Sequence, residues 1–421
     1  MRSRPRRECC ASGRRAESGL PRGDAATGRS RGLSWPWWAG ALAATPYLSA
    51  PAGALLFGRG LPLHIYDPPA DDAAPLVSVV IPARNEADRI ARCVGSVLAT
   101  AYPKVEIIVV DDRSVDGTGR IVADLAARDP RLTLLSGEEL PRGWFGKPWA
   151  CWQGAQMARG SLLLFTDADT WHGPELLGRA VGMLHARRAD FVSLLQRQEM
   201  RTFWERIVQP HLFALIGMPV LLATAGNPAR INERQSRKHA IANGQFILVT
   251  RESYDAVGGH RAVKGEVVED LMLARRYAEA GRTRWIANAM EEMSTRMYRS
   301  LGEIVEGWSK NLFMAGQILW GRAGGYVGVA ALLALVALGL LPFALLALAA
   351  AGAGPAALAF GAAGSACGML AGGIFLRRNG EGVWPAAFSW LGQLVLLWIL
   401  IRSTVRGRRR IEWKGRTYTH A

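Results

Sequence analysis

The chain has 421 residues, a formal net charge of +16 at pH 7, and 50% apolar against 20% charged residues. This composition excludes a disordered or fibrous chain, because enough apolar surface is present to offset the ordering entropy of folding. The positive charge first points to nucleic acid. However, residues 1–33 and 402–421 each carry a net charge of +6. Because both tails flank apolar segments, we expect a membrane surface and no nucleic acid as a partner.

Several well-known motifs are missing from the sequence. The five cysteines form no CxxC pair and the seven histidines show no zinc-binding spacing, which fits a reducing, cytoplasmic setting. There is no GxGxxG after a predicted strand, no GxxxxGK[ST] and no GxSxG. These absences argue against a dinucleotide-binding Rossmann domain, a P-loop nucleotide-binding protein and a hydrolase with a nucleophile elbow.

The first part of the chain is expected to attach the protein to a membrane. Residues 1–33 are rich in Arg, Gly and Ser and predict a disordered basic tail. Residues 35–58 are uncharged and long enough to span a bilayer, although Pro36, Pro46 and Pro51 weaken them as a helix. We therefore expect an N-terminal membrane segment here.

Residues 75–321 have the character of a soluble α/β domain. Short β-branched runs alternate with amphipathic stretches at helical spacing. The predicted strands are 77–82, 106–110, 132–135, 162–166, 191–195 and 246–249, and the predicted helices include 87–99, 117–128, 174–187 and 270–280. Near-continuous apolar strands that alternate with helices are typical of a mainly parallel sheet covered on both faces.

Residues 326–401 are strongly apolar and predict C-terminal transmembrane helices. The apolar runs cover 327–351, 355–376 and 383–401, and the basic tail 402–421 follows them. Two spans would return this tail to the side of the α/β domain, whereas three would not. The sequence leaves both arrangements open.

Two further apolar stretches do not qualify as separate spans. Residues 207–224 are uncharged, but a crossing there would place acidic motifs on opposite sides of the membrane. We therefore expect an interfacial helix, interrupted at Pro210 and Pro219. The apolar stripe of residues 301–319 predicts either a second interfacial helix or a helix that faces the core.

Polar groups directly follow two of the predicted strands. The first strand ends at Pro82 and is followed by Arg84 and Glu86, while the second ends at Asp111 and Asp112. Ligands of open α/β sheets bind at the carboxyl ends of the strands, where paired carboxylates can accept hydrogen bonds from a nucleobase or ribose. For each motif taken alone, an ordinary loop or turn is the alternative.

Two more acidic motifs point to metal and proton chemistry. Asp167 and Asp169 follow an apolar strand, and carboxylates two residues apart on extended backbone face the same side. This arrangement suits a divalent ion shared with substrate phosphates. Glu269 and Asp270 open a helix, where Asp270 is either an N-cap or a general base. The helix N-terminus lowers the pKa of such a base, so geometry or neighbouring carboxylates must make it effective.

Isolated cations and one aromatic residue complete the candidate set. Lys147, Arg296 and Lys310 lie in short motifs where a cation can hold a phosphate, and Trp308 lies close to Lys310 in the chain. A structural role is the alternative for each of them.

As a set, these motifs resemble glycosyltransferase family 2 in order and spacing over residues 75–320. The membrane segments and the stretches 202–206, 294–298 and 307–311 resemble the branch associated with hopanoid and carotenoid glycosylation. The resemblance implies the GT-A fold, a Rossmann-like, mainly parallel α/β sheet, and a bound Mg²⁺ or Mn²⁺. Processive members carry QxxRW, whereas this chain reads Gly-Trp-Ser-Lys-Asn at 307–311. That departure favours a single transfer over polymer synthesis.

The resemblance also implies a role for each matching residue. Asp270 matches the catalytic base, and Asp169, with Asp167, matches the metal-binding DxD motif. The nucleotide-sugar site would comprise Pro82, Arg84, Glu86, Asp111, Asp112, Lys147 and Asp167. The acceptor or diphosphate region would comprise Glu269, Arg296, Trp308 and Lys310.

The resemblance and the membrane segments together imply an inverting, metal-dependent glycosyltransferase in the cell membrane, multi-pass, with its catalytic domain in the cytoplasm. It would move a sugar from a nucleotide-sugar donor, most simply a UDP-sugar, to a hydrophobic lipid acceptor such as a hopanoid or carotenoid. One alternative is a synthase of a polysaccharide or a polyprenyl-phosphate sugar. Another is a membrane scaffold with an inactive nucleotide-binding domain. The sequence identifies no protein partner.

Overall fold

A computed structural model describes residues 61–223, 230, 232, 240–352, 354–406, 411–413 and 416–418. Side chains are described for most of these residues, with the main gaps at 216–223, 310–311 and 313–329 and in the two short C-terminal segments. The expected basic tail 1–33 and N-terminal membrane segment 35–58 lie outside the described residues.

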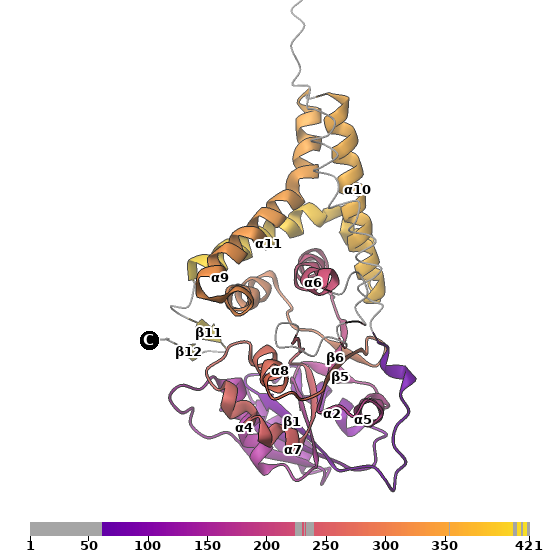
Figure 1. Ribbon diagram of the computed structural model, residues 1–421, viewed down its shortest axis with the longest axis vertical. Helices are drawn as coiled ribbons and strands as arrows, with labels where there is room; N and C mark the ends of the chain where they lie inside the picture. Colours follow the sequence, from indigo (N-terminus) through magenta and orange to yellow (C-terminus); the bar gives the residue numbers. More distant parts are fainter. Residues whose placement is uncertain are drawn as a thin grey trace, which may run out of the picture.

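A seven-stranded sheet forms the centre of the α/β domain (Figure 1). Strands β3, β2, β1 and β4 run parallel to one another, and β9 runs parallel to β6, whereas β8 runs antiparallel to both β4 and β6. The mainly parallel sheet expected from the sequence is thus confirmed. In the spatial order β3-β2-β1-β4-β8-β6-β9, the strands are β3 (Leu132–Ser136), β2 (Val105–Asp111), β1 (Val77–Ala83), β4 (Leu162–Thr166), β8 (Phe246–Thr250), β6 (Phe191–Leu195) and β9 (Arg284–Asn288).

Helices cover both faces of this sheet. On β1, the fully buried Val79 packs in the cluster that includes α2 and α5, whereas the next residue, Val80, packs in the cluster that includes α4 and α8. Because both faces are covered, the strands read as continuous apolar runs. The helices of the domain are α2 (Ile90–Leu98), α3 (Thr118–Ala126), α4 (Gly146–Met157), α5 (Leu176–Ala186), α7 (Arg251–Ala256) and α8 (Glu269–Glu279), with the short 3₁₀ helices η1 (Leu63–Ile65) and η4 (Gly259–Val263).

A second, smaller sheet lies next to the end of β4. It has the order β5-β10-β7, with β5 (Thr170–His172), β10 (Met293–Thr295) and β7 (Arg197–Gln198). These strands of two or three residues were not predicted, because they are too short to show an alternating pattern. The small sheet nevertheless brings residues 170, 197 and 294 together, from three distant parts of the chain.

Long helices form the remainder of the described chain. They are α6 (Phe203–Ala223), α9 (Leu301–Ala350), α10 (Pro355–Arg378) and α11 (Ser389–Arg406), with η5 (Trp384–Phe388) before α11 and a hairpin of β11 (Ile411–Trp413) and β12 (Arg416–Tyr418) after it.

Two details of these helices differ from the sequence predictions. The stripe 301–319 and the apolar run 327–351, which the sequence analysis treats as separate segments, are parts of one continuous helix, α9. Pro210 and Pro219 were expected to interrupt the helix that contains them, but both lie within α6. Helix α6 packs against α9 and α11, and this packing helps to offset the loss of backbone hydrogen bonds at proline.

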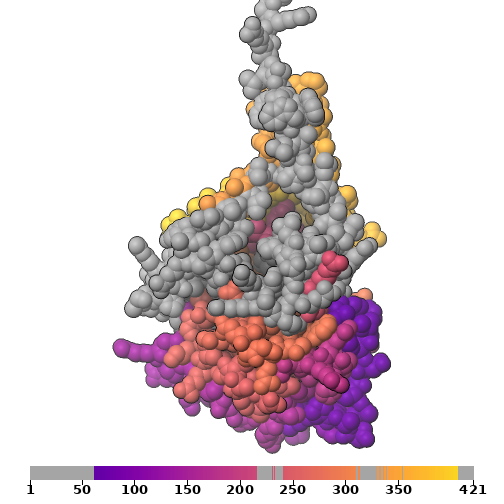
Figure 2. All heavy atoms as spheres, viewed as in Figure 1, coloured from indigo at the N-terminus to yellow at the C-terminus, as the bar shows by residue number. Residues whose placement is uncertain are grey.

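Among the described residues, two helical segments are long and apolar enough to cross a bilayer, judged by length and composition. They are Pro355–Arg378 and Trp384–Val405. In the space-filling view, the α/β domain forms the broad lower body, and the described atoms of the C-terminal helices lie above it (Figure 2).

The central strand β4 should be sensitive to loss of core volume. Leu164 is fully buried, so Leu164→Ala should lower the free energy of unfolding by about 2–5 kcal/mol through lost apolar contact and a residual cavity. Val115→Ala is the control, since Val115 is 87% exposed and surface changes stay within about 0.5 kcal/mol. Denaturant unfolding of the full chain in detergent measures both, and equal midpoints would contradict the assigned core.

Candidate active site

The predicted acidic residues follow strands that end at one edge of the sheet. The register pairs Ala83 at the end of β1 with Asp111 at the end of β2. On the other side of β1, the parallel strand β4 ends at Thr166. The residues that follow these strands therefore share the carboxyl edge of the sheet, where open α/β sheets bind ligands.

Lys147, in the first turn of α4, joins two of the acidic motifs. Its Nζ lies 2.7 Å from Asp167 Oδ1 and 2.9 Å from Glu269 Oε1. Burial alone would lower the pKa of Lys147, but the charges of Asp167 and Glu269 outweigh burial and raise this pKa well above its usual value. A charged amine thus holds the end of β4 against the start of α8.

Asp270 lies in the first turn of α8, next to Glu269. The N-cap of this helix is Val268, so the N-cap alternative for Asp270 is not what the structure shows. Its Oδ1 accepts a hydrogen bond from Leu271 N (2.7 Å) and its Oδ2 accepts one from Gly244 N (2.8 Å). Burial and the neighbouring charge of Glu269 raise the pKa of Asp270 to about 6, against the opposing effect of Lys147. The result is a carboxylate more basic than an ordinary Asp and held from two sides.

Asp169 is a partly buried carboxylate that lies near other acidic groups. Burial and the charges of Asp167 and Glu86 raise its pKa to about 7. In the described part of the chain, its Oδ1 is buried without a hydrogen-bond partner. An unpartnered carboxylate oxygen in such surroundings is a fitting ligand for a cation.

The donor set at Asp169 and Asp167 fits a divalent ion that shares its coordination with a substrate. Within the residues that the structure describes, no group of three or more His, Cys, Asp or Glu side chains is arranged to hold a metal ion. Mg²⁺ normally takes one or two protein carboxylates and completes its shell with water and phosphate oxygens. The two carboxylates of the DxD motif match that pattern.

Two connected loops form the neighbouring part of the edge. Asn85 and Arg113 have positive φ values of 52° and 59°, a conformation that costs energy in residues with a side chain. The loops bind each other, because Asn85 Oδ1 accepts from Val115 N (3.0 Å) and Thr118 Oγ1 accepts from Glu86 N (2.8 Å). No residue pattern in the chain predicts this backbone strain.

The other predicted nucleotide-site residues lie at this same edge. Pro82 is the penultimate residue of β1 and is partly exposed. The Arg84 guanidinium donates to the backbone oxygens of Asp112 and Arg113, so it bridges the β1 and β2 loops. Asp111 Oδ1 accepts from Ser114 N at 3.1 Å. Asp112 is only 2% exposed.

The predicted acceptor-region residues are more scattered. Arg296 Nε and Nη2 donate to the two carboxylate oxygens of the fully buried Glu205, at 2.9 and 3.1 Å. This pair ties the end of β10 to α6. Trp308 is buried and packs with Phe213 at a ring separation of 6.0 Å and with Tyr298 at 6.2 Å. The side chain of Lys310 lies outside the described residues.

A buried hydrogen-bond network holds the backbone of the DxD motif. This network was not predicted from the sequence. Thr170 Oγ1 donates to Asp167 O (2.8 Å) and Thr295 Oγ1 to Asp169 O (3.3 Å). His172 Nε2 lies 3.0 Å from Thr166 Oγ1, and burial lowers its pKa to about 3, which keeps it neutral. The signal in the sequence that could have predicted this network is the presence of Thr166, Thr170 and His172 close to the two aspartates.

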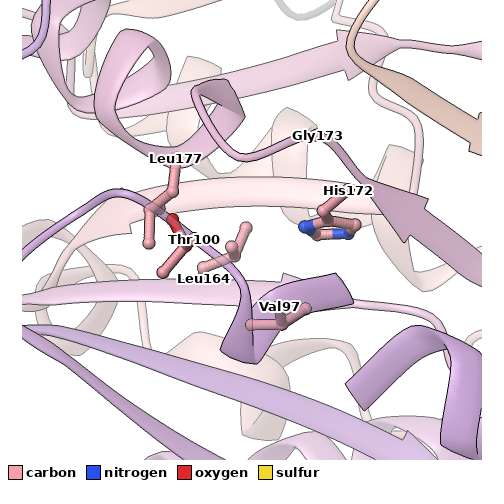
Figure 3. Close-up of a pocket in the computed structure, with 6 residues that line it drawn as sticks. All are labelled: Val97, Thr100, Leu164, His172, Gly173 and Leu177. Atoms are coloured by element: carbon pink, nitrogen blue, oxygen red, sulfur yellow. The ribbon is translucent and has the colours of Figure 1, made fainter. Parts of the chain in front are cut away.

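The same network reaches the loop that holds Asp270. Thr166 Oγ1 donates to Gln245 O (2.8 Å), and Gln245 directly follows the Gly244 amide that binds Asp270. Beside the network lies a small cavity with His172 at one end (Figure 3). Its lining residues are Val97, Thr100, Leu164, His172, Gly173 and Leu177. Its volume of about 10 Å³ is near that needed by one water molecule, too little for a nucleotide.

Comparison with known proteins identifies the family of the domain that contains this site. Residues 78–272 match the family model described as Glycosyl transferase family 2. The chain carries a glycosyl transferase family 2 domain. The matched segment contains the β1, β2 and β4 motifs and ends two residues after Asp270. The findings thus favour an enzyme, a glycosyltransferase, over the inactive scaffold.

Similar proteins include two curated family relatives and one solved structure. The 4,4'-diaponeurosporenoate glycosyltransferases of Staphylococcus haemolyticus and Staphylococcus aureus are each 26% identical, over 272 and 281 residues, which is 64% and 66% of this chain and 70% of each relative. A mannosyltransferase from Pyrobaculum calidifontis, solved with GDP-mannose and Mn²⁺, is 21% identical, with a TM-score of 0.49 over 88% of this chain and 99% of that chain.

The close approach of Gly244 to Asp270 provides a test of the family 2 site. A Cβ at Gly244 would lie 3.0 Å from Asp270 Oδ2 and 3.1 Å from Lys147 Nζ, so Gly244→Ala should displace both side chains. Small misplacements of reacting groups cost up to about 100-fold, and we expect kcat to fall about 10- to 100-fold with little loss of thermal stability. Gly95→Ala in α2 is the control, because a Cβ there meets nothing within 4 Å. Equal kcat values for the two variants would rule out this role for Gly244.

Proposed function

We propose that this glycosyltransferase is an inverting enzyme that uses a divalent ion to move a sugar from a nucleotide-sugar donor, in the simplest case a UDP-sugar, to a hydrophobic lipid acceptor. One observation carries the proposal. The single amine of Lys147 binds Asp167 of the DxD motif and Glu269, the neighbour of Asp270. One site therefore contains both Asp167, which is suited to binding the donor diphosphate through a metal ion, and Asp270, which is suited to accepting a proton.

Asp270 is the proposed general base. Its carboxylate would accept the proton of the acceptor hydroxyl or carboxyl group while the acceptor oxygen attacks the anomeric carbon of the sugar. The bond from that carbon to the diphosphate oxygen breaks on the opposite side, so the anomeric configuration inverts. The Gly244 and Leu271 amides fix the carboxylate, and its raised pKa strengthens it as a base.

The remaining carboxylates and cations are assigned to the donor. Asp169, with Asp167, would hold the divalent ion, which when bound neutralises charge on the departing nucleoside diphosphate. Lys147 adds a fixed positive charge at the same place. Donor-lining roles are assigned to Pro82, Arg84, Glu86, Asp111 and Asp112.

The acceptor side of the proposal rests on the relatives and on the helices above the site. The Staphylococcus relatives are named for diaponeurosporenoate, which supports a carotenoid-type or hopanoid-type lipid. Trp308 would form a wall of the acceptor site, while Arg296, engaged by Glu205, would position α6. The basic residues beside the apolar segments support a membrane location with the catalytic domain on the cytoplasmic side.

Substitution of Asp270 is the direct test of the function. Asp270→Asn keeps the size of the side chain but removes the base, so transfer of labelled sugar into the lipid extract should fall by about 10² to 10⁴-fold. Asp124→Asn, on the exposed side of α3, is the matched control and should retain wild-type transfer. Wild-type transfer by Asp270→Asn to every accepted lipid would overturn the mechanism. Label that stays in the aqueous phase as a polymer would instead identify a polysaccharide synthase.

The pH dependence of transfer should report Asp270 and its cation. The carboxylate form is required, so kcat/KM should fall about tenfold per pH unit below the Asp270 pKa of about 6. Lys147 lowers this pKa, so Lys147→Met should move the acidic limb to higher pH, beside any loss of rate. Lys104→Met, at an exposed site, should leave the limb unchanged. If the acidic limb of the pH profile does not move in Lys147→Met, the charge of Lys147 does not influence the pKa of the catalytic base.

Removal of divalent ions should abolish transfer reversibly. Membranes washed with EDTA should lose activity and regain it with Mg²⁺ or Mn²⁺, because the charge on the diphosphate leaving group would otherwise be unbalanced. Asp169→Asn should not be rescued by the ion concentration that restores the wild type. Full activity in EDTA would contradict a metal at the DxD motif.

A further inference from the structure

Helix α11 and the preceding η5 are apolar on two opposite faces. The inner face packs against α6 and α9 through Leu396, Ile399 and Leu400, all nearly or fully buried. The outer face is exposed although it is also apolar, with Trp398 56% and Val405 82% exposed. Its large side chains recur at helical spacing and are Trp384, Phe388, Trp390, Leu394, Trp398, Ile401 and Val405. A helix facing water would carry polar residues there.

The start of this segment is fixed to the α/β domain. In the loop between α10 and η5, Asn379 Oδ1 accepts from Gln198 N of strand β7 at 2.8 Å, and Glu381 Oε1 accepts from Met200 N at 3.0 Å. Glu381 also pairs with Arg206 at 2.9 Å. The loop therefore lies against the small sheet, on the same side as the DxD motif.

The far end of α11 is tied to the same domain through the start of α9. Arg402 Nη2 lies 2.8 Å from Glu306 Oε2 in the second turn of α9. Just before α9, Arg299 pairs with Asp88 of the β1 loop at 3.0 Å, and Glu303 lies 3.5 Å from Arg89. Both ends of α11 are thus held on the side of the α/β domain.

These tethers decide between two topologies that hydropathy leaves open. At 1.5 Å per residue, the 22 residues Trp384–Val405 are about 33 Å long, enough to cross a hydrocarbon core of about 30 Å. Ends that bind one soluble domain cannot lie on opposite sides of a bilayer. In contrast, α10 and the C-terminal part of α9 rise away from the sheet (Figure 1). Residues 327–351 of this part of the chain carry no charge.

We propose that α9 and α10 form the membrane-crossing hairpin and that α11 lies in the plane of the bilayer surface, with its outer face in the lipid leaflet next to the catalytic domain. The occupant of that face is a lipid surface. Three tryptophans on it fit the headgroup boundary, where Trp is enriched. The charge fits as well, because Arg377, Arg378 and the basic tail 402–421 lie at the two ends of the segment, near anionic headgroups. This inference rests on the membrane location in the proposed function.

Cysteine labelling in sealed membrane vesicles tests this arrangement with the full chain. The background carries Cys9→Ser, Cys10→Ser and Cys367→Ala, and it keeps Cys93 and Cys151, which are buried. Single sites are then introduced as Ala127→Cys in the catalytic domain, Ala351→Cys at the end of α9 and Gly382→Cys before η5, all three exposed, and as Arg408→Cys in the basic tail, two residues after α11. The probe is a membrane-impermeant PEG-maleimide, applied to vesicles of each orientation and after detergent.

The expected pattern places Ala127→Cys, Gly382→Cys and Arg408→Cys on one face and Ala351→Cys on the other. Labelling of Arg408→Cys from the face opposite to Gly382→Cys would show that α11 crosses and would overturn the inference. Labelling of Ala351→Cys together with Ala127→Cys would overturn the crossing hairpin. Spin labels at Leu394 and Trp398 should show equal, shallow immersion, whereas a gradient of depth between them would also contradict an in-plane helix.

The labelling pattern does not depend on catalysis, so the two proposals can fail separately. Sugar transfer in the same vesicles together with a crossing α11 would leave the proposed function intact and remove this inference. If the labelling pattern is as expected but no sugar is transferred from any nucleotide sugar, this inference would stand and the proposed function would fail.

Discussion

The architecture of the site depends on one ammonium group that contacts carboxylates from two other elements. Asp167 follows β4, Glu269 and Asp270 open α8, and Lys147 begins α4. Buried carboxylates repel one another and cost free energy unless a cation compensates them. One lysine only partly does so, because Asp169 and Asp270 keep raised pKa values. The remaining negative charge would favour binding of a divalent ion and uptake of a proton, as the proposed function requires.

The sequence predicted the part of the structure that follows from local pattern. Apolar strands followed by polar residues identified β1, β2 and β4 together with the acidic groups at their ends, because parallel strands place their carboxyl ends on one edge. The convergence of Asp167 with Glu269, about a hundred residues later in the chain, could be expected only from the family resemblance. In the structure, Lys147 contacts both residues. From the sequence, Lys147 is a candidate for phosphate binding and not for this contact.

What the sequence could not predict depends on long-range packing. For Arg296, the sequence allowed either phosphate binding or a structural role, because its partner Glu205 lies in a helix about ninety residues earlier. The prolines of α6 looked like helix interruptions, yet neighbouring helices hold that helix together. Strands β5, β7 and β10 are two or three residues long and exist because each completes the hydrogen bonding of the others. None of these features leaves a periodic signal.

The unbroken course of α9 sets the orientation of the catalytic domain. One helix of 50 residues begins beside the β1 loop and continues without interruption to residue 350. Each residue of an α-helix advances 1.5 Å and turns about 100°. If the proposed membrane arrangement holds, the number of residues in this helix would set the distance and the rotation of the catalytic domain relative to the bilayer. The acceptors would then be limited to molecules whose reactive group lies at that distance from the lipid.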